Sequence, residues 1–146
     1  MNDNPPDPKN PPASHPEHAT RSTAIPSGRR VLLVEDDERV ARAESWILEQ
    51  AGFAVTVAGT GPDGLALARA ELPMAVILDG DLPGLDGFEV CRRLKADPKT
   101  RHIPVLFCSG RFDSRELARA AGANDSVEKT DAVAELVERL NRLLGL

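Results

Sequence analysis

Short apolar runs and amphipathic segments alternate five times along the chain. Each apolar run has the length of a strand that is buried on both faces, as in a parallel sheet. The predicted strands cover residues 31–34, 53–57, 74–78, 103–108 and 126–128. The last strand is weak, because Val127 is its only strongly apolar residue.

The segments between and after these runs have the spacing of amphipathic helices. The predicted helices cover residues 38–51, 61–72, 88–96, 115–121 and a last segment with Asp131 as its N-cap. Four apolar residues recur at helical spacing and predict the buried face of the first helix: Val40, Ala43, Ile47 and Ala51. The last helix has the clearest apolar stripe: Val133, Leu136, Val137, Leu140 and Leu144.

Strands that alternate with helices indicate a parallel sheet with helices on both faces. The units in residues 29–146 predict one doubly wound α/β domain, with five strands in the order 2-1-3-4-5 and five helices, the flavodoxin-like arrangement. In such folds, ligands bind at the carboxyl ends of the strands. Residues that directly follow the strands are therefore the first candidates for chemistry.

Residues 1–28 differ from the rest of the chain, because seven of the 12 prolines fall there and bulky apolar residues are almost absent. A segment of this composition buries too little apolar surface to offset the entropy lost on ordering. We expect a disordered tail that acts as a spacer. A docking role is open, although no motif in the tail supports one.

Composition narrows the classes of function. The net charge of -5 and the pI of about 5.2 argue against general affinity for nucleic acids, which depends on basic surface. No apolar run reaches the length of a membrane span, and the N-terminus lacks a signal-peptide pattern. Cys91 and Cys108 lack metal-binding or redox spacing, so we expect reduced, buried thiols in a cytoplasmic protein.

Polar side chains follow four of the predicted strands. Glu35 and Asp36 follow the first strand, and Asp79 follows the third. Ser109 follows the fourth strand and Lys129 the fifth. Because these strands are neighbours in the predicted order, the side chains are expected to converge on one crevice.

This set of side chains suits phosphoryl chemistry with a divalent cation. Three carboxylates that lie close together repel one another unless a cation joins them, and Mg²⁺ is the usual hard cation beside phosphate. An aspartate can act as a nucleophile and form an acyl phosphate, while Lys129 and Ser109 can hold phosphoryl oxygens. Each residue alone has an ordinary explanation as a helix cap, a turn residue or a surface lysine. Their joint occurrence at four strand ends favours a site.

Four motifs resemble the receiver domain of bacterial two-component response regulators, over about residues 30–145. The first strand and its acidic pair are VLLVEDD at 31–37, and the loop after the third strand is LDGDLPGLDG at 78–87. The fourth strand ends in a hydroxyl in IPVLFCS at 103–109, and the lysine closes AGANDSVEK at 121–129. The spacing between the motifs agrees with the family as well.

The resemblance implies a role for each candidate residue. Asp79 would be the phosphoacceptor, and Asp36 and Asp79 would bind Mg²⁺ directly. Glu35 would help mainly through water, and Asp81 would offer its backbone carbonyl to the metal. Two further side chains would hold the phosphoryl group: Ser109 and Lys129.

The sequence departs from the family on the side of the conformational switch. Ser126 replaces the usual aromatic residue, Gly80 replaces a bulky apolar residue after the acceptor, and Thr130 replaces the proline after the lysine. A cis bond between Lys129 and Thr130 would cost about 2.5–4 kcal/mol, so we expect a trans bond there. We also expect Asp81 and Arg111 to pair across the mouth of the site and to slow hydrolysis.

The sequence is most consistent with a stand-alone receiver that accepts a phosphoryl group on Asp79 from a histidine kinase or phosphotransfer protein. Its output would be a protein partner, because the chain ends after the last helix. We expect a monomer or weak dimer, no nucleic-acid or membrane binding, and at most self-catalysed phosphorylation and dephosphorylation. The alternative is an interaction module that ignores phosphorylation. A metal-dependent phosphatase is less well supported, since no cap insertion is evident.

Overall fold

The computed structural model describes residues 27–110, 114–129 and 132–146, so the predicted tail falls almost entirely outside the described residues. A short 3-10 turn, η1 (Ser27–Arg29), precedes five strands: β1 (Arg30–Val34), β2 (Ala54–Ala58), β3 (Ala75–Asp79), β4 (Val105–Ser109) and β5 (Asp125–Glu128). The helices are α2 (Glu38–Gln50), α3 (Gly61–Glu71), α4 (Gly87–Ala96), α5 (Ser114–Ala120) and α6 (Ala132–Leu144). Every predicted element is present, and the described ends lie within about two residues of those expected.

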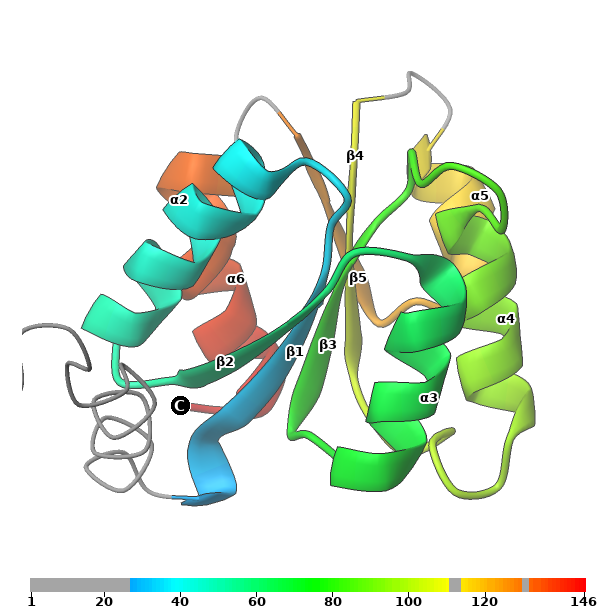
Figure 1. The fold of residues 1–146 in the computed structure, drawn as a ribbon, viewed down its shortest axis with the longest axis horizontal. Helices are drawn as coiled ribbons and strands as arrows, with labels where there is room; N and C mark the ends of the chain where they lie inside the picture. The colour runs from blue at the N-terminus through cyan, green and yellow to red at the C-terminus, as the bar shows by residue number, and fades with distance from the viewer. Residues whose placement is uncertain (1–26, 111–113, 130–131) are drawn as a thin grey trace, which may run out of the picture.

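The strands pair in parallel in the order β2-β1-β3-β4-β5, which confirms the predicted topology. Because each helix returns the chain to the same side, the carboxyl ends of the strands share one edge of the sheet (Figure 1). β3 and β4 are buried along their whole length, as expected for central strands of a sheet covered on both faces.

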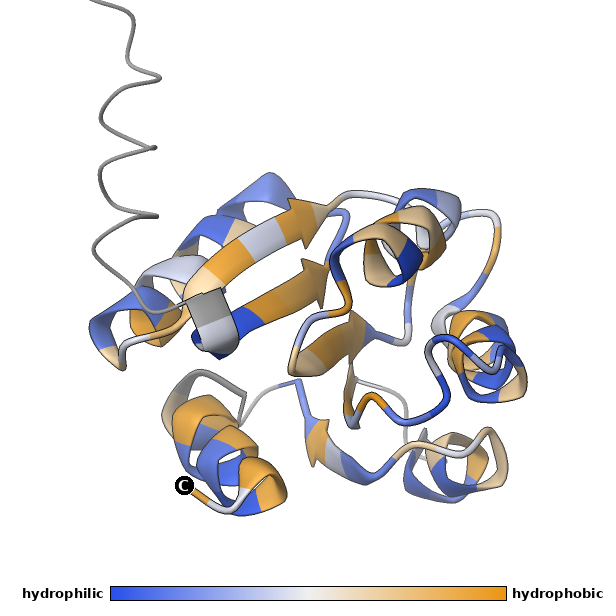
Figure 2. Ribbon diagram, turned by 90° about the horizontal axis from the view of Figure 1, so that it is seen from below, coloured by the Kyte–Doolittle hydropathy of each residue, from blue (hydrophilic) through white to orange (hydrophobic). Residues whose placement is uncertain are grey.

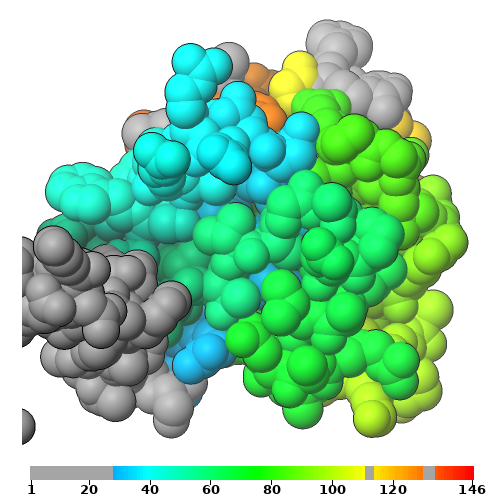
Figure 3. All heavy atoms as spheres, in the orientation of Figure 1, coloured from blue at the N-terminus to red at the C-terminus, as the bar shows by residue number. Residues whose placement is uncertain are grey.

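Helices cover the two faces of the sheet unequally. Helices α2 and α6 lie on one face, and α3, α4 and α5 lie on the other (Figure 1). Successive strand residues point to opposite faces, so Leu32 and Val34 join one apolar cluster while Val31 and Leu33 join the other. Figure 2 shows the strands as largely apolar, and Figure 3 shows that side chains fill the space between the ribbons.

Polar N-caps set where three of the helices begin. Asp37 caps α2, Thr60 caps α3 and Asp86 caps α4, each through a side-chain oxygen that accepts a backbone N–H. Asp86 accepts the N–H of Glu89 at 2.9 Å. Because α2 and α4 follow short loops after β1 and β3, their capped N-terminal ends lie toward the carboxyl edge of the sheet (Figure 1).

The buried face of α2 differs from the predicted one. The prediction included Ala43, which is exposed. The buried residues of the helix are instead Ala41, Glu44 and Leu48. The prediction was wrong at Ala43, while Val40, Ile47 and Ala51 are half-buried. It missed the centre of the stripe because a charged residue stands there. Apolar periodicity cannot identify a face whose central member is a carboxylate.

Other predictions about the core are confirmed. Leu136 and Leu140 of the α6 stripe are fully buried, and Cys91 and Cys108 are free and buried. The predicted cap at Asp131 lies outside the described residues. Within the described ranges, no helix combines the length and the apolar character that crossing a membrane requires.

Candidate functional site

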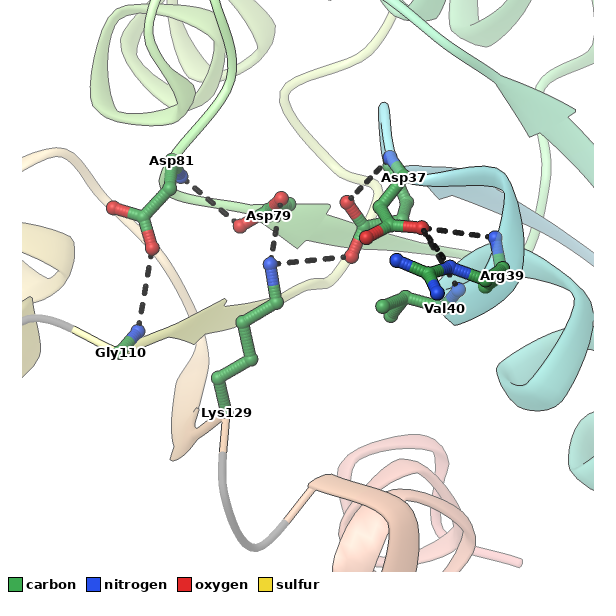
Figure 4. A network of polar contacts seen from close by, with 8 residues as sticks. Asp37, Arg39, Val40, Asp79, Asp81, Gly110 and Lys129 are labelled. Carbon is green, nitrogen blue, oxygen red and sulfur yellow. Dashed lines mark hydrogen bonds and ion pairs between the residues drawn. The ribbon is translucent and has the colours of Figure 1, made fainter.

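The predicted site residues lie together at the carboxyl edge of the sheet. Glu35 follows β1, Asp79 ends β3, Ser109 ends β4 and Lys129 follows β5. Since β1 lies beside β3, β3 beside β4 and β4 beside β5, residues far apart in the sequence become neighbours. Figure 4 shows the Lys129 side chain extending across this edge to Asp79.

Three carboxylates form a compact acidic cluster: Glu35, Asp36 and Asp79. One oxygen atom from each lies within 4.8 Å of the others. Glu35 and Asp79 are each only 3% exposed, whereas Asp36 is exposed. The cluster therefore combines two buried carboxylates with one that faces solvent.

Lys129 bridges the two buried carboxylates. Its Nζ lies 3.1 Å from Oδ2 of Asp79 and 3.3 Å from Oε1 of Glu35. Burial alone would lower the pKa of Lys129, but the hydrogen bond to Asp79 and the charges of both carboxylates outweigh burial and raise it above the ordinary value. The lysine is thus held as a fixed positive charge beside Asp79.

The acidic cluster carries more negative charge than Lys129 can neutralise. Burial, the hydrogen bond between Glu35 and Asp79, and the charge of Asp79 together raise the pKa of Glu35 to about 8. A hard divalent cation with oxygen ligands would relieve this repulsion, and the donor set of three carboxylates fits Mg²⁺. The residues therefore fit the metal that the sequence predicts.

Asp81 lies at the rim of the acidic cluster. Its backbone N–H donates to Oδ1 of Asp79 at 3.0 Å, and its exposed side chain accepts a weak bond from the N–H of Gly110 at 3.4 Å (Figure 4). These contacts fix one oxygen of Asp79 and join the loop after β3 to the end of β4. The predicted partner of Asp81, Arg111, lies outside the described residues.

Backbone hydrogen bonds place the hydroxyl of the site. The N–H of Lys129 donates to the carbonyl of Ser109 at 3.0 Å, and the N–H of Gly80 donates to the carbonyl of Cys108 at 2.8 Å. Ser109 is only 1% exposed at the end of β4. The backbone bonds thus continue past the strand ends and hold Ser109 at the edge of the sheet that carries Asp79 and Lys129.

Of the two atypical positions near Lys129, residue 126 is described by the structure and residue 130 is not. Ser126 lies on β5, opposite Phe107 of β4, and is half-buried. Thr130 lies outside the described residues, so the predicted trans bond after Lys129 remains a prediction.

Glu44 is an ionisable residue near the site, and the sequence analysis did not single it out. It is 3% exposed on the face of α2 that packs against the sheet. Burial raises the pKa of Glu44 to about 7; the charge of Lys129 acts in the opposite direction, and that of Asp79 raises the pKa further. Glu44 lies three positions after Ala41 and four before Leu48, so the three residues share one face of the helix. This spacing is the sequence signal that could have identified Glu44 as buried.

Comparison with known proteins agrees with this geometry. Residues 31–141 match the family described as the response regulator receiver domain. The transcriptional regulatory protein CseB of Streptomyces coelicolor is 44% identical over 116 residues, which cover 78% of this chain and 48% of that protein. The response regulator PleD of Caulobacter vibrioides is 43% identical over 103 residues, or 68% of this chain and 22% of that protein. The chain thus spans about half the length of CseB and less than a quarter of the length of PleD.

Solved structures show the same fold. The receiver domain of a sensor histidine kinase from Pseudomonas aeruginosa, determined with a magnesium ion in its active site cleft, is 30% identical. It superposes with a TM-score of 0.74 over 82% of this chain and 99% of that chain. The chemotaxis response regulator CheY4 of Vibrio cholerae is 26% identical, with a TM-score of 0.73 over 79% of this chain and 98% of that chain. The match over residues 31–141, together with the fold and the strand-end residues, shows that the chain belongs to the response regulator receiver domain family.

Proposed function

We propose that the chain accepts a phosphoryl group on Asp79 from a histidine kinase or phosphotransfer protein and changes its binding surface in response. The observation that carries this proposal is the pairing of Lys129 with Asp79 inside the acidic cluster. A buried carboxylate held by a lysine, with neighbouring carboxylates that fit a divalent cation, is a suitable acceptor for a dianionic group.

The proposed reaction is an in-line displacement at phosphorus. A carboxylate oxygen of Asp79 attacks, a new O–P bond forms an acyl phosphate, and the P–N bond of the phosphohistidine breaks as the imidazole leaves. Asp36 and Asp79 would hold Mg²⁺ directly, Glu35 would hold it through water, and Asp81 would contribute its backbone carbonyl. The ion would supply positive charge for the phosphoryl oxygens.

Two residues of this chain would then hold the phosphoryl group. Lys129 already lies 3.1 Å from Asp79, so a short movement would transfer its Nζ to a phosphoryl oxygen. The Ser109 hydroxyl, at the end of the neighbouring strand, would donate to another. Both contacts are charge-assisted, and both would be stronger in this buried setting than in water.

The proposal includes the setting in which the site works. We infer a cytoplasmic location, which free thiols at Cys91 and Cys108 suit. We also infer output through a protein partner, and no catalytic activity beyond the gain and loss of the phosphoryl group. Capture of proteins by the phosphorylated and unphosphorylated forms, compared side by side, tests the output.

The direct test is the intact mass of the full chain after incubation with acetyl phosphate and Mg²⁺. The expected result is a gain of one phosphoryl group that is absent in D79N and absent when EDTA removes the metal. D81N is the matched control, because it changes a neighbouring carboxylate but leaves the backbone carbonyl of residue 81 in place. No gain in a protein shown by circular dichroism to be folded would overturn the proposal.

A second candidate is an interaction module that ignores phosphorylation. The observation in its favour is Ser126, which supplies no aromatic ring at the position where the family usually has one. The two candidates differ in one measurement. Partner binding that is equal for the parent protein and D79N, under phosphorylating conditions, would support the module.

A further inference from the structure

An aromatic ring occupies the space beside Gly80, the residue that directly follows Asp79. A Cβ atom at position 80 would lie 2.6 Å from Cε1 and 2.9 Å from Cζ of Phe107, and 3.0 Å from Cβ of Ser109. Gly80 is not among the residues with a positive φ angle. Glycine is therefore required here by the space that the ring and the serine occupy.

The same ring contacts the first turn of α4. Phe107 is fully buried and stacks on Phe88, with ring centroids 4.6 Å apart and an angle of 28° between the planes. A Cβ at Gly87 would collide with the carbonyl oxygen of Asp79 and lie 2.7 Å from Cα of Gly80. The first turn of α4 therefore packs directly on the backbone of the acceptor and on the ring.

Strand geometry connects this ring to the hydroxyl of the site. Phe107 and Ser109 are two residues apart on β4, so their side chains point to the same face of the sheet. The register places Ser126 of β5 opposite Phe107. Among the described strand residues on this face, Phe107 is thus the one that carries a ring, and position 126 contributes only a small polar side chain.

We propose that Phe107 is a positioning residue that joins the phosphoryl site to the first turn of α4, and this rests on the proposed function of Asp79. The Phe107 ring and Cβ of Ser109 both border the small space beside Gly80, and tightly packed interiors transmit small displacements rather than absorb them. When Ser109 moves toward the phosphoryl group, the ring shifts against Phe88. The response then appears in α4 rather than at residue 126.

The test follows backbone amide signals of the full, labelled chain as beryllofluoride and Mg²⁺ are added as a phosphoryl analogue. We expect shifts in the loop at 79–82 and in α4 that exceed those in β5. F107L keeps an apolar side chain but removes the ring. F107L should retain the shifts in the loop, while the amide shifts in α4 should become smaller by about threefold or more.

The matched control is F53L, because Phe53 is equally buried but belongs to the cluster on the opposite face of the sheet. It should keep both responses, which separates positioning from a general loss of packing. F107M, with an unbranched side chain, is measured beside F107L in case the leucine variant unfolds.

Equal α4 responses in F53L and the folded variants at Phe107 would overturn this inference. So would a parent protein whose loop at 79–82 responds while α4 stays silent, and that result would leave the proposed function intact. A folded parent whose loop does not respond at all would overturn both. The three outcomes are distinguished in a single titration series.

Discussion

Glu44 provides a quantitative test of the electrostatics around the site. The residue is 3% exposed, and its pKa lies at about 7 instead of the ordinary 4.5. In the unfolded chain the carboxyl ionises from about pH 4.5, while in the folded protein it keeps its proton until about pH 7. The folded state therefore binds more protons over this interval, and stability falls as the pH rises through it.

The size of the effect follows from the same values. At about 1.36 kcal/mol per pH unit, the interval from 4.5 to about 7 corresponds to roughly 3 kcal/mol of lost unfolding free energy. E44Q removes the ionisation with little change in shape. The free energy of E44Q minus that of the parent should thus rise by roughly 3 kcal/mol between pH 4.5 and pH 8.

The assay is urea unfolding of both proteins across this pH range, with EDTA present so that bound metal does not contribute. Other titrating groups are common to the two proteins and cancel in the difference. E38Q is the matched control, because Glu38 lies on the same helix but is exposed. A difference between E44Q and the parent that stays constant within about 0.5 kcal/mol over this range would show that Glu44 does not titrate with a raised pKa in the folded protein.

Three further predictions concern packing, reactivity and metal binding. G80A should lower the unfolding free energy by about 1–3 kcal/mol, because the added methyl group meets the Phe107 ring. The loss should be smaller in an F107L background. Urea unfolding of the parent, G80A, F107L and the double variant checks this, and strictly additive losses would contradict it. Burial raises the pKa of the Cys91 thiol to about 11 and that of Cys108 well above its ordinary value. Both thiols should therefore resist a thiol reagent until urea unfolds the chain. Fast labelling of the native protein would contradict their burial. Mg²⁺ at about 100 times its dissociation constant should add about 2.7 kcal/mol to the unfolding free energy, and D36N should remove most of that gain; an equal gain in D36N would show that the ion binds elsewhere.

Several features of the site were predictable because they depend on local sequence. The apolar runs locate the strands, and the candidate residues stand at or just after the strand ends, as Asp79 does at the last position of β3. The rule that helices connect parallel strands predicts a parallel sheet whose strands share one carboxyl edge, and the flavodoxin-like order makes the strands that carry the site neighbours. The convergence of Glu35, Asp79 and Lys129 follows without knowledge of any distance.

Other features depend on packing between segments and could not be predicted in the same way. The close approach of Phe107 to Gly80 depends on how a ring from β4 fits a gap beside β3. The burial of Glu44 depends on how α2 is rotated against the sheet, and its apolar pattern alone indicated a different face.

Local sequence was sufficient to predict which elements form, how they alternate along the chain, and which side chains stand at the carboxyl edge of the sheet. These follow from periodicity and connectivity, which are properties of neighbouring residues. Packing between distant segments sets three other features: Lys129 bridges two carboxylates, Glu44 is buried, and Phe107 fills the space at Gly80. Such contacts and pKa values arise from distances of a few ångströms between distant segments, and close packing sets those distances.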